Sequence, residues 1–422
     1  MKKPFSFIHA ADIHLDSPLG GLPTHDTAAA ETIRAAPRSA FERLVDTAIA
    51  RKVSFVVIAG DLYDGSQRDI NTAIFFGRQM ARLQAVNIPV YVLFGNHDFE
   101  SPVTGQIPRS PNLHCFPSNA PGSFHIEELG VSLHGQSFPR RDVVSNLASQ
   151  YPAPASGHFN IGVLHTALGR IGHDPYAPAS PEQLRDHGYQ YWALGHVHQH
   201  EIAVESPPVV FPGNIQGRHI GETGPKGAML VHVASDGRPA VERLVLDSVR
   251  WHRVSVDCSE HATIDDVVND CAAAIGRQVQ AATDLQPGHL HAIRVDISGE
   301  TALHGELLWL SQSLHDDIAA AASTSGARIW IEQVDLRTGA PAAPVGEIGS
   351  ELRSLLERAT EDPETLSLIY EDQTTLQGII PRDVYDVLRR EGRLWGEGPA
   401  AMHELAREGA DIALARLVEA KV

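Results

Sequence analysis

The sequence predicts an α/β fold over residues 1–250, a small α+β domain over residues 251–338, and a helical region over residues 339–422. Two observations support this. In the first part, short apolar runs alternate with stretches that carry apolar residues at helical spacing. Near residue 250 the order of these runs changes, and 422 residues are too many for one ordinary core. We therefore expect more than one domain.

Five runs in the first part are typical of buried strands because each is short, apolar and bounded by polar or glycine residues. They are FSFIHA, VSFVVIAG, IPVYVLFG, FNIGVLH and YQYWALGH. RSAFERLVDTAIARK and INTAIFFGRQMARLQ are predicted helices between them, and PPVVFPG, AMLVHV and AVERLVLD are predicted hairpin strands. This pattern favours a sandwich of two sheets flanked by helices.

The second part follows the order β-α-β-α-β, with strands RVSVDC, HAIRVDISG and RIWIEQVDL around helices TIDDVVNDCAAAIGRQVQ and GELLWLSQSLHDDIAAAA. TGAPAAPVG at 338–346 is predicted to be a linker because Ala, Pro and Gly dominate it. The chain after it is acidic and helical, with an apolar stripe of Ile348, Leu352, Leu355 and Leu356. We expect a capping domain followed by a region that either faces solvent or docks on a partner.

Acidic residues are concentrated after residue 250. Residues 1–250 hold 20 Lys and Arg against 23 Asp and Glu, and residues 251–422 hold 14 against 29, within a net charge of −18. This argues against a chain that binds nucleic acid unaided but leaves a polyanionic substrate open for the first part. No apolar run approaches the roughly 18–20 residues of a membrane span, and the N-terminal run is expected to be a strand rather than a signal peptide. Cys115, Cys258 and Cys271 show no paired spacing, which favours a reduced, cytoplasmic compartment.

Five short motifs stand at or just past the ends of predicted strands, where α/β sheets bind ligands. They are Asp12-Ile13-His14, Gly60-Asp61, Gly95-Asn96-His97-Asp98, His165 and Gly195-His196-Val197-His198. In D-x-H and H-x-H the side chains at i and i+2 point the same way off an extended chain, so each motif aims two ligands at one point. Any one of these motifs is weak evidence for a metal site, because it occurs by accident or for structural reasons. All five in this order, each at the end of a predicted strand, favour a metal centre.

The candidate ligands comprise two carboxylates, one amide and four imidazoles: Asp12, His14, Asp61, Asn96, His165, His196 and His198. Mixed nitrogen and oxygen ligation suits Mn, Fe or Zn and does not suit calcium. Seven ligands are too many for one ion and suit two, and Asp61 is the expected bridge because it is a carboxylate alone on its loop. Two such ions can hold a hydroxide and a phosphate for in-line attack.

The motif set resembles that of the calcineurin-like metallophosphoesterases. The runs FIHAADIHLDSPL, GDLYD, GNHD, LHT, LGHVH and FPGNIQGRHIGETGPKGAMLV are similar to the DNA-repair exonuclease branch that includes the SbcD and YhaO proteins, over residues 5–235. The resemblance implies two ligand sets. These are Asp12, His14, Asp61 and His198 for one ion, and Asp61, Asn96, His165 and His196 for the other.

The resemblance also implies two catalytic residues. His97 would face the scissile phosphate, and Asp98 would orient His97, with a helix N-cap as the alternative for Asp98. Some members of the wider nuclease group carry His where this chain has Asp64, so Asp64 is left without a role. For Arg218 and His219 a phosphate-facing loop is one alternative, and an ordinary surface loop is the other.

Other residues have a simpler interpretation. His9 alternates with Phe7 on the first strand and is expected in the core. Trp309, Trp330 and Trp395 are likewise expected to be core residues rather than base-stacking groups.

The function implied by the resemblance is that of a two-metal-dependent DNA exo- or endonuclease of DNA repair, with Mn²⁺ preferred and Fe or Zn as alternatives. It also implies an SMC-like coiled-coil ABC ATPase as partner and a homodimer. Residues 69–87 hold apolar candidates for the dimer surface, but burial of this helix against the sheet is the favoured interpretation. Two alternatives remain. The same centre could hydrolyse small nucleotide-type substrates, and a scaffold subunit with a vestigial site is the third option, against which the intact ligand set argues.

Overall fold

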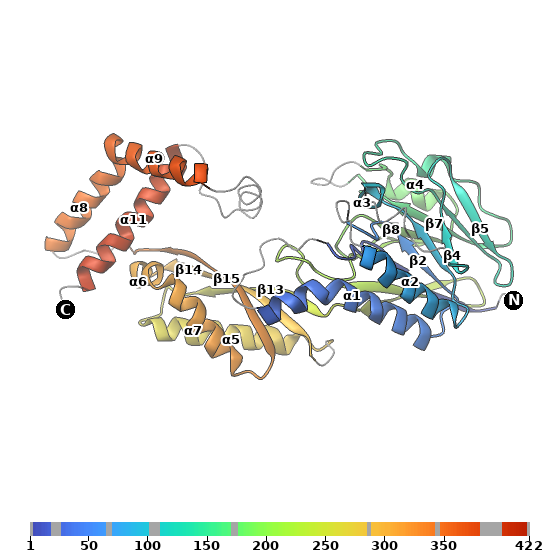
Figure 1. Ribbon diagram of the computed structural model, residues 1–422, viewed down its shortest axis with the longest axis horizontal. Coiled ribbons are helices and arrows are strands. Elements are labelled where there is room, and N and C mark those ends of the chain that lie inside the picture. The colour runs from blue at the N-terminus through green and yellow to red at the C-terminus, as the bar shows by residue number, and fades with distance from the viewer. Residues whose placement is uncertain are drawn as a thin grey trace. The chain divides into compact units, whose positions relative to one another are not determined.

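The computed structural model describes residues 3–17, 27–64, 70–100, 110–169, 176–284, 288–341, 347–379 and 399–419. Its contacts divide the chain into two compact units. Unit 1 is formed mainly by residues 23–251, together with the N-terminal segment, and unit 2 mainly by residues 252–283 and 291–422. Figure 1 labels the elements of both.

Unit 1 contains two six-stranded sheets. The strands of the first are β1 (Phe5–Ala10), β2 (Phe55–Ala59), β3 (Val90–Leu93), β4 (Leu113–Cys115), β11 (Gly227–Val233) and β12 (Pro239–Val245). Those of the second are β5 (Gly122–Ile126), β6 (Val131–Gly135), β7 (Phe159–His165), β8 (Tyr191–Gly195), β9 (Glu201–Glu205) and β10 (Pro208–Phe211). The strand orders are β12-β11-β1-β2-β3-β4 and β5-β6-β7-β8-β10-β9. Strands β1 to β4 pair in parallel, as do β6, β7 and β8, so their carboxyl ends share an edge within each sheet.

Helices and the second sheet cover opposite faces of the first sheet. Helices α1 (Thr27–Ala50) and α2 (Ile70–Gln84) pack Phe41 and Phe76 with Ile8 of β1 in one cluster. The layer between the sheets includes Phe7 and Tyr191, whose rings meet edge to face at 5.4 Å. Successive residues of β1 therefore serve different layers, as the alternation of a strand requires. The predicted sandwich of sheets flanked by helices is confirmed.

His9 lies in the layer between the sheets and is fully buried. Its Nδ1 is 3.0 Å from the Tyr191 hydroxyl, and its Nε2 is 3.0 Å from the Leu194 carbonyl oxygen. Both ring nitrogens thus have partners, as a buried polar side chain requires. The predicted core position of His9 is confirmed.

The first half of unit 2 carries a three-stranded sheet and three helices. The elements in chain order are β13 (Val249–Asp257), α5 (Ile264–Ala281), β14 (Leu290–Glu300), α6 (His304–Trp309), α7 (Ser311–Ser323) and β15 (Arg328–Gly339). A capping box between Thr263 and Asp266 starts α5. The single helix expected from GELLWLSQSLHDDIAAAA is divided at Leu310 into α6 and α7, although neither Gly nor Pro marks the break.

The second half of unit 2 is helical and exposes apolar side chains. It contains α8 (Glu347–Glu361), α9 (Pro363–Ile379) and α11 (Pro399–Glu419). Leu355 on α8 and Leu368 and Tyr370 on α9 are 57%, 61% and 56% exposed. None of the helices in the described residues is long and apolar enough to cross a membrane.

The tryptophans of this part only partly follow the expectation. Trp330 is 7% exposed and belongs to the core, as expected. Trp309, at the end of α6, is 43% exposed, so its predicted core position is wrong. It is the last residue of α6 before the break at Leu310, a break that the sequence pattern did not indicate. Trp395 lies outside the described residues.

Candidate metal centre

The predicted ligands follow the carboxyl ends of strands from both sheets of unit 1. Asp12 and His14 come after β1, Asp61 after β2 and Asn96 after β3, while His165 ends β7 and His196 and His198 follow β8. All seven lie near one another at this edge, in two groups. The groups with ligand atoms within 4.8 Å of one another include Asp12, His14 and His198, and Asp61, His165 and His196.

Asp61 belongs to the group of His165 and His196 and also reaches His14 of the other group. Its Oδ2 is 3.3 Å from His165 Nε2 and 3.8 Å from His14 Nε2. Asn96 joins the first of these contacts, with Oδ1 3.0 Å from His165 Nε2. On the other side, His14 Nε2 and His198 Nε2 are 3.2 Å apart. A carboxylate placed this way can serve two ions at once.

The chemistry of these side chains fits divalent ions. Asp12 and Asp61 are each 1% exposed, and a buried carboxylate is costly unless cations surround it. Two imidazole nitrogens facing each other across 3.2 Å are the arrangement of ligands that share one ion. Burial and the charge of Arg218 hold the pKa of His14 well below its usual range, so the ring is neutral, which is the form that binds metal.

Burial and neighbouring charges shift the pKa of Asp61 and of His165 in opposite directions. Burial by itself raises the pKa of a carboxyl, but contacts with His165 and His14 hold the pKa of Asp61 well below its ordinary value. Burial likewise lowers the pKa of an imidazole, yet the Asp61 carboxylate raises the pKa of His165 to about 9. Asp61 is therefore ionised at neutral pH, as a bridging ligand must be.

Four of the ligands have left-handed backbone conformations, which cost about 1–3 kcal/mol each in a residue other than glycine. The φ angles are 49° for Asp12, 47° for His14, 51° for Asp61 and 99° for His196. Hydrogen bonds hold the strained segments: Asp12 N donates to the Gly60 carbonyl at 3.0 Å, and His196 N donates to Asp12 Oδ1 at 3.0 Å. Strain held in place by such contacts is typical of functional sites.

Two glycines make room for His165. A Cβ on Gly60 would lie 2.2 Å from His165 Nδ1, and the φ of Gly60 is +99°. A Cβ on Gly95 would lie 2.3 Å from Asp61 Oδ1 and 2.8 Å from His165 Nε2. Neither position accepts another residue without moving a ligand.

His97 follows Asn96 on the short helix α3 (Asn96–Glu100) and is 38% exposed. Its Nδ1 is 2.9 Å from Asp64 Oδ1, and its backbone N–H donates to Asp61 Oδ1 at 3.1 Å. The hydrogen bond with Asp64 raises the pKa of His97. Asp64, for which the sequence predicted no role, is thus the carboxylate in contact with this imidazole.

Asp98 is fully buried and holds two loops together. Its carboxylate accepts backbone N–H groups of Gly95 at 2.9 Å, Tyr63 at 2.9 Å and Leu62 at 3.2 Å. Asp98 is the third residue of α3, so the N-cap alternative is wrong, and its contact with the Gly95 N–H is the one that an N3 carboxylate makes in a capping box. The other two contacts tie α3 to the loop after β2. The orientation of His97 by Asp98 stays a prediction, and the structure offers Asp64 as the alternative.

Sequence reasoning missed Glu222, which contacts one of the predicted ligands. Glu222 Oε1 is 2.6 Å from His198 Nδ1 and 3.1 Å from a guanidinium nitrogen of Arg218. Although burial raises the pKa of a carboxyl, these two contacts hold the pKa of Glu222 well below its ordinary value. Arg218 also reaches within 3.7 Å of Asp64, so this loop lies beside the centre, whereas His219 is 63% exposed.

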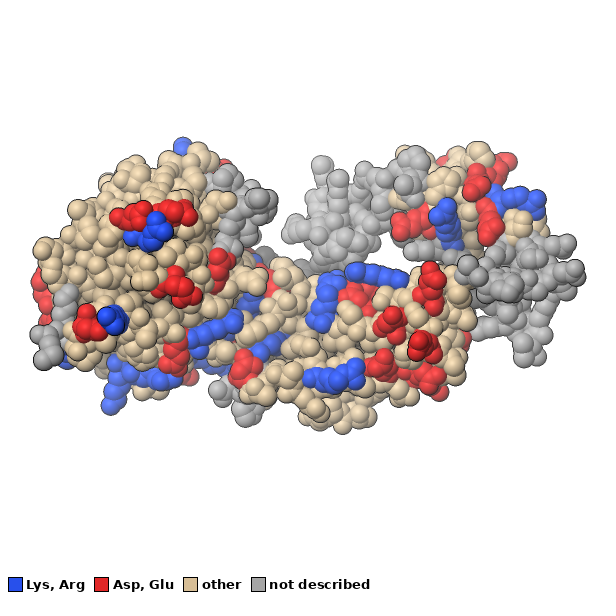
Figure 2. All heavy atoms as spheres, turned by 180° about the vertical axis from the view of Figure 1, so that it is seen from behind, with Lys and Arg blue, Asp and Glu red and all other residues tan. Residues whose placement is uncertain are grey.

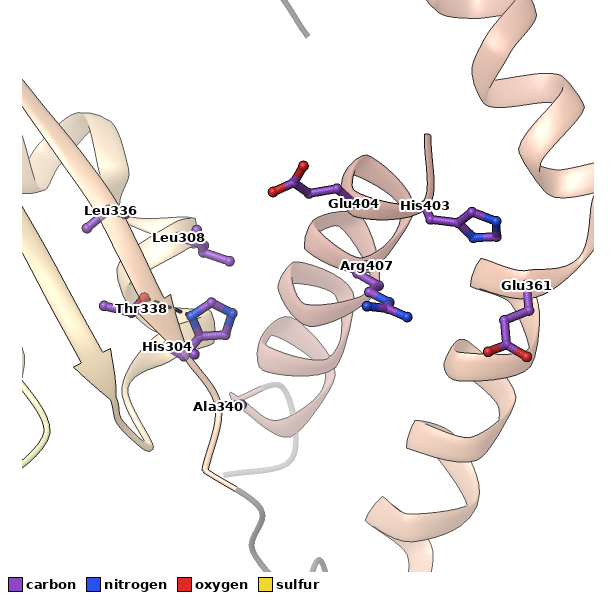
Figure 3. A pocket seen from close by; sticks show the side chains of 10 residues that line it. His304, Leu308, Leu336, Thr338, Ala340, Glu361, His403, Glu404 and Arg407 are labelled. Carbon is purple, nitrogen blue, oxygen red and sulfur yellow. Dashed lines mark hydrogen bonds between the residues drawn. The ribbon is translucent and has the colours of Figure 1, made fainter. Parts of the chain in front are cut away.

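Unit 2 contains a separate cavity of about 810 Å³. His304, Thr338, Glu361 and Arg407 are among the residues that line it. Figure 3 shows Glu404 of α11 on the side of α6 and β15, while His403 and Arg407 of α11 point toward Glu361 of α8. None of the predicted site residues lines it, and its charged members Glu361, Glu404 and Arg407 are exposed. The cavity is not part of the metal centre.

The two-sheet α/β fold brings imidazole, carboxylate and amide side chains together at its strand ends, which is an arrangement suited to a metal centre. Residues 5–200 match the model of the calcineurin-like phosphoesterase family, and residues 251–339 match that of the middle domain of the metallophosphoesterase YhaO. The chain therefore contains a calcineurin-like metallophosphoesterase domain, with a YhaO-type middle domain after it.

Curated relatives agree with this family. The metallophosphoesterase YhaO of Bacillus subtilis is 38% identical over 265 residues, which cover 62% of this chain and 65% of that protein. DNA double-strand break repair proteins Mre11 are more distant. That of Methanopyrus kandleri is 24% identical, covering 49% of this chain and 48% of its own, and that of Aeropyrum pernix is 27% identical, covering 62% and 66%. The chain thus spans about half to two thirds of the length of these relatives.

Proposed function

We propose that this chain is a two-metal-dependent nuclease that hydrolyses phosphodiester bonds of DNA in repair, as an exo- or endonuclease. The observation that carries the proposal is the convergence of six other ligand side chains around Asp61. The phosphoesterase family supports the hydrolase class, and the relatives named as DNA double-strand break repair proteins support DNA as the substrate.

The proposed ions have separate ligands on either side of Asp61. One would be held by Asp12, His14, Asp61 and His198, and the other by Asp61, Asn96, His165 and His196. Mn²⁺ is the proposed ion, with Fe and Zn as alternatives, because the ligands mix imidazole nitrogen with carboxylate and amide oxygen. When bound, the two ions supply positive charge that activates water and neutralises the phosphodiester.

His97 is the proposed proton donor to the leaving oxygen. Its Nδ1 is held by Asp64 at 2.9 Å, so Nε2 is the ring nitrogen that would face the substrate. The raised pKa of His97 favours the protonated ring that a general acid needs. Asp98 contributes by fixing the backbone of the loops that carry Asp61 and Asn96.

A partner protein is proposed to supply most of the DNA-binding surface. On the face of unit 1 drawn in Figure 2, the described charged side chains lie in small groups of both signs, with no continuous basic stripe among them. We propose the SMC-like coiled-coil ABC ATPase implied by the resemblance, with residues 339–422 as its docking region and residues 251–338 as the capping domain. Exposed Leu355, Leu368 and Tyr370 supply apolar contacts for such a helix-to-groove interaction.

Two further assignments complete the proposal. Helix α2 buries Phe76, Met80 and Leu83 but leaves Ile70 and Ile74 56% and 43% exposed, which supports a homodimer through this helix. All three cysteines are free thiols, which supports a reducing, cytoplasmic location.

The test is an assay of metal-stripped chain reloaded with Mn²⁺, on labelled linear DNA beside bis-p-nitrophenyl phosphate. His97→Ala is expected to keep its metal and to lose turnover by about 10²–10⁴-fold, because a general acid is removed. His232→Ala, an exposed histidine paired with Glu242, is the matched control. Turnover of the small ester with untouched DNA would favour a small-substrate enzyme, and turnover of neither with two ions bound would favour a scaffold.

A further inference from the structure

The loop between β10 and β11 encloses the segment that carries His198. Lys226 Nζ donates a hydrogen bond to the His198 carbonyl oxygen at 2.9 Å, and Asn214 N donates to the same oxygen at 3.3 Å. A Cβ on Gly213 would lie 2.9 Å from this oxygen, so the loop touches the ligand segment directly. The carbonyl oxygen of His198 therefore accepts two hydrogen bonds from this loop.

The carboxylate of Glu222, a residue of this loop that is 7% exposed, takes part in several hydrogen bonds. Its Oε2 accepts hydrogen bonds from Asn214 Nδ2 at 2.9 Å and from the backbone N–H of Arg218 at 2.8 Å. Its Oε1 is 2.6 Å from His198 Nδ1. Both oxygens are engaged within the loop, so the carboxylate has a fixed position.

The contact with Glu222 determines which ring nitrogen of His198 is available. An ionised carboxylate only accepts hydrogen bonds, so His198 Nδ1 must donate to it. A guanidinium nitrogen of Arg218 is also 3.2 Å from His198 Nδ1, but both are then donors, and Arg218 bonds Glu222 Oε1 at 3.1 Å instead. The lone pair of His198 is left on Nε2, which is 3.2 Å from His14 Nε2 and 4.0 Å from Asp12 Oδ1.

We infer that Glu222 is a positioning residue that fixes the tautomer and orientation of His198 at one of the two ions. The inference rests on the proposed function, because it assumes that His198 is a ligand. Carboxylates that hold a ligating imidazole in this way typically change metal affinity by 10–100-fold when removed. Glu222 touches neither substrate nor ion in this account and acts only through His198.

A purely structural role makes a different prediction. Glu222 also balances the positive charges of Arg218 and buried Lys226, so its loss could loosen the whole loop. Loosening would lower the stability of the metal-free protein and would affect both ions. A positioning role affects the ion that His198 binds and leaves the ion of His165 and His196 in place.

The test measures Mn²⁺ binding to the full chain by titration calorimetry, with thermal unfolding of the metal-free protein measured in chelator. Glu222→Gln keeps the shape of the side chain and removes its charge, and Glu222→Ala removes the acceptor altogether. Glu242→Gln is the matched control because Glu242 also pairs with one arginine, Arg51, and one histidine, His232, but on the surface.

We expect Glu222→Gln to weaken one of two binding events by about 10–100-fold, Glu222→Ala to weaken it further, and Glu242→Gln to change neither. Unchanged affinities in both Glu222 variants would overturn the inference, and so would equal weakening of both events with a lower unfolding temperature. Because the binding experiment uses no substrate, its outcome is independent of nuclease activity. A chain that binds two ions but never cuts DNA would refute only the nuclease proposal and not the inference about Glu222. A wild-type chain that does not bind two ions would refute both.

Discussion

Unit 1 and the helical half of unit 2 depart from ordinary globular structure in opposite ways. The metal centre of unit 1 buries charged side chains such as Asp12 and Asp61, whereas helices α8 and α9 of unit 2 expose apolar ones such as Leu355, Leu368 and Tyr370. In the described part of the chain, all nine non-glycine residues with positive φ lie in unit 1, and four of them are predicted ligands. Buried charge on strained backbone supports the proposed reaction centre, and exposed apolar side chains on an acidic helical region support the proposed docking surface.

Among the variants of this chain, the largest effect on turnover is expected at Asp61 in unit 1. Asp61→Asn removes the negative charge that both proposed ions share, so we expect turnover to fall by about 10³-fold or more, equivalent to several kcal/mol of lost transition-state stabilisation. Metal content after dialysis should fall in parallel. Asp46→Asn, an exposed aspartate paired with Arg82 in the same unit, is the control. If Asp61→Asn kept full turnover, the reaction centre would not be at the proposed ligands of unit 1.

A smaller effect is expected at Asp64. Its contact with Nδ1 raises the pKa of His97, and the protonated ring is the proposed acid. Activity should therefore be lost as pH rises through the pKa of His97, and Asp64→Asn should move this alkaline limb to lower pH while lowering turnover about 10–100-fold. The pH profile of kcat, with the exposed Asp186→Asn as control, measures both. If the limb does not move, Asp98 rather than Asp64 orients His97.

The smallest effect on the isolated chain is expected in the helical half of unit 2. Leu368 is 61% exposed, so Leu368→Glu should change the free energy of unfolding by less than about 0.5 kcal/mol and leave turnover intact. Leu314 on α7 is fully buried, and Leu314→Glu should cost several kcal/mol. Denaturant unfolding compares the two. If Leu368→Glu also leaves binding to the proposed ATPase unchanged in a pull-down, the docking surface is elsewhere.

What the sequence could predict follows from the geometry of strands. Asp12, Asp61 and Asn96 each follow an apolar run of the first sheet, and parallel strands bring such positions to one edge of that sheet whatever the loops between them do. The parallel strands β7 and β8 do the same for His165 and His196 in the second sheet. Glu222 and Asp64 were not predicted because their contacts with His198 and His97 depend on loop conformation, across 24 and 33 residues of sequence. Short strands without a clear apolar run, such as β4 and β5, carry too little periodicity to be recognised.

The central claim is that one carboxylate, Asp61, serves two ions. Anomalous diffraction from a crystal of the chain loaded with Mn²⁺ tests it most directly. We predict two peaks about 3.5–4 Å apart, with Asp61 between them and His198 and His165 on opposite sides. A single peak, or two peaks of which only one contacts Asp61, would contradict the account.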